Sequence, residues 1–368
     1  MLKKVSLTAI IVLIIGFAYA QNGVKEEAKP VGVSDPGKTQ QSKPEDEEKS
    51  PFALSGSVDA YYRYNFHNVD DGWHSNNYTS FTNSQNSFEL GMASLKGEYS
   101  KGKVTAVADL GFGKRAEEFA YADNATLLAV KQAYVSYAPS DKVKFTMGKW
   151  ATHVGYELLD PQLNRNYSMS YMFSYGPFSH TGIKADITAS EHIGIMLGVA
   201  NPTDMTTADF SRKFVLAQLS GTFDKASFFL NYVGGSPASD VTAHQVGLTA
   251  TATVSDQFGL GYDGTVKFVN AFGTKGSWWG SALYLNFDPS SVFGITVRGE
   301  YFGDKDAVAG FGTNIFDATL SFNIKPVENI MIIPEFRLDG AKDEIFTKND
   351  GSFTKGSGQF ILAAVVSF

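Results

Sequence analysis

The sequence contains no cysteine. This absence excludes disulfides, thiolate metal sites, cysteine nucleophiles and the acylated cysteine of a lipoprotein. Charged residues are also scarce, at 19% of the 368 residues, and the formal net charge is −7. An acidic chain lacks the basic surface that nucleic-acid binding requires. Any chemistry must come from other groups, and we expect no nucleic-acid partner.

Long apolar runs are missing as well, apart from one short run near the N-terminus. No segment has the roughly 20 consecutive apolar residues of a transmembrane helix. Yet 43% of the residues are hydrophobic and 14% are aromatic, which is too apolar for a disordered chain. These observations disfavour both a helical membrane bundle and disorder.

The N-terminus has the pattern of a signal peptide. Lys3 and Lys4 precede a short apolar run that ends at a small-x-small motif, Ala18-Tyr19-Ala20. We predict a signal peptide over residues 1–20 and an exported mature chain, with a retained membrane anchor as the alternative.

The next segment has a different composition. Residues 21–50 contain no aromatic residue and include the acidic run PEDEEK. Such a segment buries too little apolar surface to offset its ordering entropy. We predict a disordered acidic periplasmic linker, which is either a tether or only a solvated tail, before a single folded unit over residues 51–368.

Beyond residue 51 the dominant pattern is a strict alternation of apolar and polar side chains. In FALSGSVDAYYRYNF, which starts at Phe52, the apolar positions recur every second residue over fifteen residues, and Asp59 and Arg63 fall on the other face. A helix would place these two charges on the apolar stripe, whereas a strand separates them from it. About sixteen such segments follow one another, so the predicted fold class is all-β.

Short and long connections alternate between the predicted strands. Seven short turns are expected near residues 100–102, 139–141, 190–191, 224–225, 255–256, 288–290 and 325–328. Eight longer polar or glycine-rich stretches are expected near 67–85, 115–125, 155–179, 201–211, 234–242, 270–276, 304–313 and 340–357.

This alternation is typical of outer-membrane barrels. Hydrocarbon offers no hydrogen-bond partner to the backbone, so only a closed sheet crosses it with strands. We predict a transmembrane up-and-down antiparallel β-barrel of about 16 strands, with short periplasmic turns and longer extracellular loops. An exported soluble β-sandwich or propeller is the alternative.

Three further features bear on the barrel. Aromatic residues near strand ends, Trp278 and Trp279 among them, predict two interfacial girdles. The last strand alternates and ends on Phe368, which resembles the C-terminal sequence that the barrel assembly machinery reads during insertion. Pro334 breaks the pattern because proline removes one ladder hydrogen bond, so we expect a bulge there or a wrongly assigned strand.

Four segments carry a resemblance to a known family. They are SGSVDAYYRYNF, NSFELGMASLKGEY, KQAYVSYAPSDKVKFTMGKWATHVGYELLD and NRNYSMSYMFSYGPFSHTGIKADI. The chain from Phe52 to Phe368 resembles the OmpL-like putative β-barrel porins of Gram-negative bacteria. The resemblance implies a pore-forming protein of the cell outer membrane, supplies no catalytic residue and leaves the solute open.

Strand parity also predicts the pore-lining residues. Where the apolar face meets lipid, the other face meets the lumen, and its charged members are Asp59, Arg63, Asp109, Lys184, Asp186, Arg298, Glu300, Asp317, Glu335, Arg337 and Asp339. A sixteen-stranded barrel is wide enough for an aqueous channel that keeps such charges solvated. The acidic excess suggests a weak cation preference; the alternative is that the charges pair across strands and stiffen the wall.

The longest candidate loop spans residues 155–179. By analogy with general porins, we expect it to fold inward and narrow the channel. The candidate constriction residues are Glu157, Asp160, Asn164 and Arg165. The alternative is a loop outside the barrel, in which the alternation from Met169 to Tyr175 extends a strand.

The predicted function is an outer-membrane porin for passive diffusion of small hydrophilic solutes or ions. The alternatives are a structural or adhesive barrel and, less favoured, an outer-membrane hydrolase. The six histidines show neither metal-ligand spacing nor a nucleophile motif beside them, so we expect no enzymatic activity, no cofactor and no metal. Expected partners are outer-membrane lipid, lipopolysaccharide, the assembly machinery and the solutes, and a homo-oligomer stays open.

Overall fold

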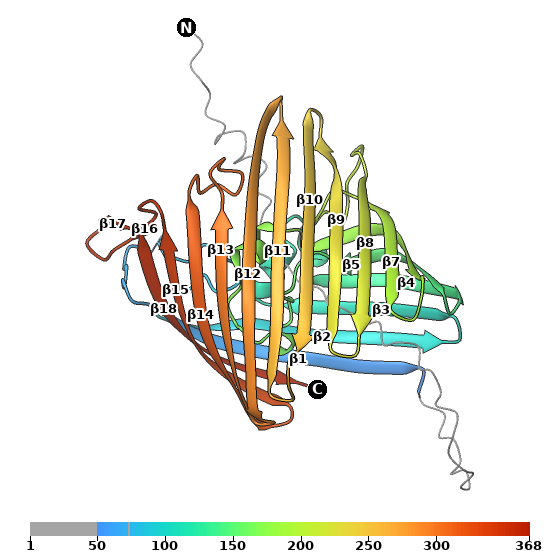
Figure 1. Cartoon of the computed structure of the whole chain (residues 1–368), viewed down its shortest axis with the longest axis horizontal. Coiled ribbons are helices and arrows are strands. Elements are labelled where there is room, and N and C mark those ends of the chain that lie inside the picture. The colour runs from blue at the N-terminus through green and yellow to red at the C-terminus, as the bar shows by residue number, and fades with distance from the viewer. Residues whose placement is uncertain (1–49, 73) are drawn as a thin grey trace.

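The computed structural model describes residues 50–72 and 74–368. The predicted signal peptide and the linker up to residue 49 lie outside the described residues and stay predictions. Sixteen antiparallel strands form one closed barrel, shown in Figure 1. They follow chain order around the wall, which closes where β1 (Phe52–Asn65) pairs with β18 (Gly356–Ser367). The predicted fold class is confirmed.

The other fourteen barrel strands lie between these two along the chain. They are β2 (Ser87–Lys101), β3 (Val104–Phe112), β4 (Val130–Ser140), β5 (Val143–Ala151), β6 (Ser179–Thr188), β7 (Ile193–Ala200), β8 (Phe214–Phe223), β9 (Ala226–Ala238), β10 (Val241–Thr253), β11 (Phe258–Ala271), β12 (Thr274–Ser290), β13 (Phe293–Gly303), β14 (Asn314–Val327) and β15 (Ile330–Ala341). A separate two-stranded sheet, β16 (Phe346–Thr347) with β17 (Phe353–Thr354), belongs to the last long connection. Among the described residues, no helix is both long enough and apolar enough to span a bilayer.

Alternation places apolar side chains on the outer wall. On β18, Leu362 and Val366 face outward and are 41% and 43% exposed, whereas Ile361 and Val365 face inward and are buried. The same parity puts Trp279 outside and Trp278 inside, because neighbouring residues of a strand point to opposite faces. The expectation that both tryptophans join an interfacial girdle is therefore wrong for Trp278, which packs against other aromatic side chains inside the barrel.

The connections follow the predicted alternation with two exceptions. All seven predicted short turns are short, and six of the eight predicted long loops are long. The loops expected near 234–242 and 270–276 are instead two-residue turns at 239–240 and 272–273. Phe272 and Gly273 both have positive φ, as the tight hairpin turns that match strand twist require. Strands β9 to β12 are extended as a result and rise above their neighbours in Figure 1.

Pro334 lies within β15, so the expected bulge or wrongly assigned strand is not found. It pairs with Leu362 of β18. On the other side, the ladder between β14 and β15 keeps one register from the Ser321–Glu335 rung to the Ile324–Ile332 rung. The proline lies between these two rungs, so only the pairing next to it is lost and the register is kept. The nearest register shift lies between Ile324 and Val327, closer to the β14–β15 turn.

Short helices occupy the connections. The β3–β4 connection contains α2 (Lys114–Phe119) and η1 (Ala125–Ala129), and the β5–β6 connection contains η2 (Pro161–Leu163) and α3 (Tyr171–Tyr175). Helix α3 replaces the strand extension that alternation suggested, because Ser170 caps the helix and accepts a hydrogen bond from the Phe173 N–H.

Candidate functional site

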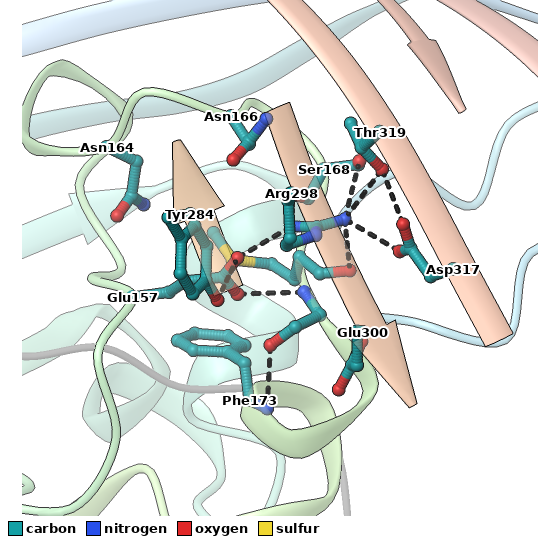
Figure 2. Close-up of polar contacts among 12 residues, drawn as sticks. Glu157, Asn164, Asn166, Ser168, Phe173, Tyr284, Arg298, Glu300, Asp317 and Thr319 are labelled. Atoms are coloured by element: carbon teal, nitrogen blue, oxygen red, sulfur yellow. Dashed lines mark hydrogen bonds and ion pairs between the residues drawn. The ribbon is translucent and has the colours of Figure 1, made fainter. Parts of the chain in front are cut away.

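The β5–β6 connection, residues 152–178, is called the inward loop here because it lies against the inner side of the wall. Its contacts reach strands on the other side of the barrel: the Tyr167 hydroxyl donates to Asp59 of β1 at 2.5 Å, and the Tyr171 N–H donates to Glu300 of β13 at 2.7 Å. Figure 2 shows the loop residues beside strands β12 to β14. The loop thus enters the lumen, which was the position expected for a constriction loop.

Arg298 of β13 is the centre of the contacts drawn in Figure 2. Its guanidinium lies 2.6 Å from Glu157 of the inward loop and 2.9 Å from Asp317 of β14, and it donates to the Ser168 carbonyl at 2.7 Å. Arg298 and Asp317 are completely buried. A planar guanidinium presents several donors in fixed directions, so one arginine joins two strands to the loop.

Two wall glutamates hold the loop backbone. Glu335 of β15 accepts from the N–H groups of Tyr167 and Ser168 at 2.7 and 3.0 Å. Glu300 accepts from the N–H groups of Tyr171 and Met172, each at 2.7 Å. A carboxylate has two acceptor oxygens, so each glutamate satisfies a pair of consecutive buried N–H groups that the loop conformation leaves without backbone partners.

Arg337 of β15 provides the complementary contact to a loop carbonyl. It donates to the Met169 carbonyl at 2.6 Å and forms ion pairs with Asp317 and Asp339 at 2.9 and 2.8 Å. Its guanidinium also lies 5.2 Å from the centre of the Tyr171 ring. The arginines therefore bind loop carbonyls while the glutamates bind loop N–H groups.

Asp59 of β1 sits beside a bulge that glycine permits. Asp59 pairs with Met92 and the next residue with Leu90, so Gly91 is the extra residue of β2. A Cβ at Gly91 would lie 1.8 Å from an Asp59 carboxylate oxygen. Asp59 accepts from the Met92 N–H at 3.0 Å and from the Tyr167 hydroxyl. Burial raises the pKa of Tyr167 well above its usual value, which keeps this phenol a neutral donor.

A second bulge turns Lys131 toward the interior, although strand alternation predicted this residue on the outer face. Asp109 of β3 pairs with Gln132 and the next residue with Val130, so Lys131 is the extra residue of β4. Lys131 is buried and lies 2.5 Å from Asp160 of the inward loop and 3.1 Å from Asp109. Alternation alone assigns Lys131 to the outer face; only the bulge turns it inward.

Two more residues that the side-chain pattern did not identify hold the inward loop, and both lie in neighbouring long connections. Arg115 of α2 is buried and donates to the Leu159 carbonyl at 3.2 Å. Asp204, in the β7–β8 connection, accepts from the N–H groups of Phe178 and Ser179 at 2.5 and 2.8 Å, where the inward loop joins β6. Burial raises the pKa of Asp204 to about 7. Neither residue belongs to a strand, so no parity rule could find them.

The four constriction candidates differ in their surroundings. Glu157 and Asp160 are buried in the ion pairs described above. The Asn164 side chain bonds within the loop, to the backbone N–H and carbonyl of Leu158. Arg165 reaches the wall, where it forms a two-pronged ion pair with Asp288 of β12 at 2.5 and 3.0 Å, and this pair is partly exposed.

The predicted pore-lining residues lie on the inner face, but most of them do not meet water. Nine are buried: Asp59, Arg63, Asp109, Arg298, Glu300, Asp317, Glu335, Arg337 and Asp339. Lys184 and Asp186 of β6 remain partly exposed, at 22% and 31%, and pair with each other at 3.3 Å. The ion pairs of Arg298 and Arg337 with Asp317 of β14 agree with the alternative that charges pair across strands, whereas the Lys184–Asp186 pair lies within β6.

Three partly exposed ion pairs lie on the inner side near the short turns. We call this set the short-turn vestibule: Lys96, Glu98, Arg165, Lys184, Asp186 and Asp288. Their ion pairs are Lys96 with Glu98 at 3.6 Å, Arg165 with Asp288, and Lys184 with Asp186. The strand residues of the set lie within six residues of a short turn. Most of the predicted inner charges are buried where the loop packs, whereas these three pairs are accessible near the short turns.

Within residues 50–72 and 74–368, no three histidine, aspartate or glutamate side chains are placed to hold a metal ion. The arrangement instead combines a closed wall, an apolar exterior and a charged interior crossed by a fixed loop. A match to the sequence model of the putative beta-barrel porin-2, OmpL-like family covers residues 51–368. The chain belongs to this family. Membership of the OmpL-like β-barrel porins and the closed barrel indicate a porin-type channel rather than an enzyme.

Solved structures support the same fold for this OmpL-like porin. The outer-membrane channel DcaP of Acinetobacter baumannii is similar with a TM-score of 0.60 at 12% identity, over 86% of this chain and 97% of that one. The anion-selective porin from Comamonas acidovorans has a TM-score of 0.58 at 12% identity, over 86% and 99%. The trimer form of OmpT of Vibrio cholerae has a TM-score of 0.55 at 12% identity, over 86% and 99%. No curated protein sequence matches the chain.

Proposed function

We propose that this porin lets small hydrophilic solutes and ions diffuse passively across the outer membrane through a pore narrowed by the inward loop. The single observation behind the proposal is the set of buried contacts that fixes residues 152–178 to the inner wall, from Asp59 on β1 to Glu300 on β13. A loop held this way reduces the cross-section without closing on a substrate. The short-turn vestibule then faces the periplasm, because short turns mark that side.

Selectivity in this proposal depends on charges that water reaches. The vestibule has three basic and three acidic residues, and its close pairs neutralise each other. The acidic excess of the eleven predicted pore-lining residues does not reach the solute, because nine of them are buried. We therefore expect a pore of weak ion preference rather than a clearly cation-selective one.

Planar-bilayer recording tests this function. Purified, refolded protein is expected to give discrete steps of small conductance, and vesicles containing it should swell in small sugars but not in large ones. Heat-modifiable gel mobility verifies folding in the same sample. Folded protein that gives neither steps nor swelling would contradict the proposal.

The filled interior favours one competing function. With nine inner charges buried, a structural or adhesive barrel would need no open lumen. Absence of conductance together with binding of an envelope or surface partner by the long loops would favour that function. The trimer form of the Vibrio cholerae neighbour suggests a homo-oligomer for this chain as well, which native mass spectrometry of the detergent-solubilised protein tests.

A further inference from the structure

The β1–β2 connection contains a segment that is buried although it has no regular structure. We call residues 75–84 the lid segment. Four consecutive residues of it are buried and belong to no helix or strand: Thr79, Ser80, Phe81 and Thr82. Connections normally run over a protein surface, because water there binds their backbone groups. The lid segment therefore depends on polar partners from its surroundings.

The lid segment packs on helix α3 of the inward loop. The Ser80 N–H donates to the Ser174 hydroxyl oxygen at 3.0 Å. The centre of the Phe81 ring lies 5.9 Å from that of the Phe173 ring, in an edge-to-face arrangement that is favourable for aromatic pairs. The lid segment thus reaches from its own pair of strands into the lumen, where α3 lies.

Two wall arginines hold the lid segment. Arg63 of β1 donates to the Ser75 and Ser84 carbonyls at 2.9 and 2.5 Å, so one guanidinium binds both ends of the segment. Arg337 of β15 donates to the Thr79 hydroxyl oxygen at 3.3 Å. Strand alternation assigned both arginines to the pore lining, and the structure uses them to hold this cover.

Two other long connections also bind the lid segment. Glu118 of α2 accepts from the Phe81 N–H at 2.7 Å and from the Asn83 side-chain amide at 2.8 Å. The Asn76 side-chain amide donates to the Thr347 carbonyl at 2.7 Å and accepts from the Thr347 N–H at 2.8 Å. It therefore pairs with β16 much as a neighbouring strand would. The lid segment joins α2, α3 and the last long connection at the long-loop end of the barrel.

The closed position also has unfavourable features. Phe81 has a φ of 74°, a left-handed conformation that is an outlier for a bulky side chain. The hydroxyls of Ser80 and Thr82 are buried and have no hydrogen-bond partner in the part of the chain that the structure describes, and the same holds for Nη2 of Arg63. A buried polar group without a partner costs free energy, which water returns once the group is exposed.

One end of the lid segment is anchored, and the other is free to bend. Gln85, which follows the segment, accepts from the Asn65 N–H at 2.8 Å and donates to the Asn65 carbonyl at 3.3 Å. Before the segment, Gly72 is exposed and has a φ of 72°, and a Cβ there would have no atom within 4 Å. A glycine takes up changes in φ at little cost. The segment can therefore lift about Gly72 while Gln85 stays on β1.

We propose that residues 75–84 form a lid over the long-loop entrance of the pore, and that this lid opens as a unit while the inward loop stays fixed. Contacts of Glu118, Arg63 and Phe81 favour the closed position, whereas opening relieves the φ of Phe81 and brings water to the unpartnered groups. The two positions give two conductance levels, of which the open-lid level is the larger. The link to conductance rests on the proposed function, but the opening itself does not.

Two threonines of the lid segment give opposite predictions. T82V removes a buried hydroxyl without a partner, so it should favour the closed lid and lower the fraction of time in the larger level several-fold. T79V removes a hydroxyl that Arg337 binds, so it should raise this fraction several-fold. Because both side chains are buried and the substitution is the same, loss of a hydroxyl alone cannot give opposite signs.

The ring of Phe81 should keep the lid closed. F81A removes its aromatic contacts and should raise the open fraction about tenfold or more. F214A is the matched control, because it removes a buried phenylalanine ring from β8, outside the lid contacts described above. It should leave the open fraction unchanged. Heat-modifiable gel mobility verifies folding of both variants.

A reversible crosslink tests whether the lid moves. The chain has no native cysteine, so S80C/S174C can be joined by a short bifunctional methanethiosulfonate and released by a reducing thiol. The crosslinked channel should stay in the small conductance level, and reduction should restore the larger one. The single variants S80C and S174C, treated with the same reagent, should keep both levels.

Hydrogen exchange at the Ser80 and Phe81 amides measures opening without any current. Exchange should be faster in T79V and F81A than in the wild type, and slower in T82V. Equal effects of T79V and T82V on exchange, or a larger conductance level that survives the crosslink, would overturn the proposal. Exchange that follows these predictions in folded protein without any conductance would contradict the proposed function alone.

Discussion

Arg298 of β13 and Glu157 of the inward loop form an ion pair of 2.6 Å in which neither side chain is more than 5% exposed. The two residues are 141 positions apart in the sequence. A buried pair of this kind adds little net stability over apolar residues, but removing one partner leaves a charge without compensation. The pair therefore fixes where the loop lies, which is what a pore of constant width needs.

Replacing Arg298 by methionine should destabilise the protein strongly. R298M leaves Glu157 uncompensated in the interior and removes one partner of Asp317, which costs about 3–5 kcal/mol for a buried pair. Urea unfolding in detergent measures the change. The double variant R298M/E157Q should recover part of the loss. If R298M lowers the free energy of unfolding by less than about 1 kcal/mol, water must reach the site and solvate the charge that is left without a partner.

The two wall glutamates should each protect a different pair of loop amides. Because Glu335 binds the N–H groups of Tyr167 and Ser168, E335Q should speed hydrogen exchange at these two amides. Glutamine offers only one acceptor oxygen, so about 1.5–3 kcal/mol of charge-assisted bonding is at risk. E300Q should act instead on residues 171–172. Uniform changes over the whole loop in both variants would contradict these assignments.

The short-turn vestibule should set the ion preference. D186N removes an accessible negative charge and should shift the reversal potential toward anions, and K184Q should shift it toward cations. D109N serves as the control because Asp109 is buried in contact with Lys131. The reversal potential in a salt gradient measures all three. A larger shift in D109N than in D186N would place the solute path on the other side of the loop.

Stability should depend on pH through Asp204. Burial raises the pKa of this carboxyl to about 7, whereas in the unfolded chain it is near 3.9. Below pH 4 both states are protonated, so the fold has its full stability. Between about pH 4 and 7 only the unfolded state ionises, and the fold loses on the order of 1.4 kcal/mol per pH unit. Above pH 7 the loss is complete.

Denaturation midpoints measured from pH 4 to pH 8 check this dependence. The wild type should become less stable as pH rises toward 7, and D204N should show a flatter profile. E344Q is a suitable control because it removes an exposed carboxyl on the same side of the barrel. Wild-type stability that rises over this interval would mean that the Asp204 carboxylate is ionised in the fold.

The alternation of side chains was enough to predict the closed sheet and the inner face. It correctly assigned Asp59 and Arg298 to the interior, because in a strand the face follows from parity alone. It failed where the backbone departs from period two: a bulge turns Lys131 inward, and a capped helix forms at Tyr171. Glycines such as Gly234 suggested a loop, but the strand continues through them.

The packing of the loop was beyond sequence reasoning for a different reason. The contacts of Glu335 with the inward loop join residues 167 or more positions apart, and the contact of Asp204 with Phe178 joins two loops. No local pattern encodes such pairs, since each depends on the closed barrel that brings them together. The burial of the inner charges could not be predicted for the same reason. Strand alternation gives the face on which Arg337 lies, but it does not show that the inward loop covers this residue.

The absence of native cysteine allows the most direct test of the inward loop. Leu163 lies in the loop and is 46% exposed, and Phe210 is fully exposed in the β7–β8 connection. Single-channel conductance is recorded for L163C and F210C before and after reaction with a bulky thiol reagent. If the loop narrows the pore, modification lowers the conductance of L163C and leaves that of F210C unchanged. Unchanged conductance in fully labelled L163C would contradict the account.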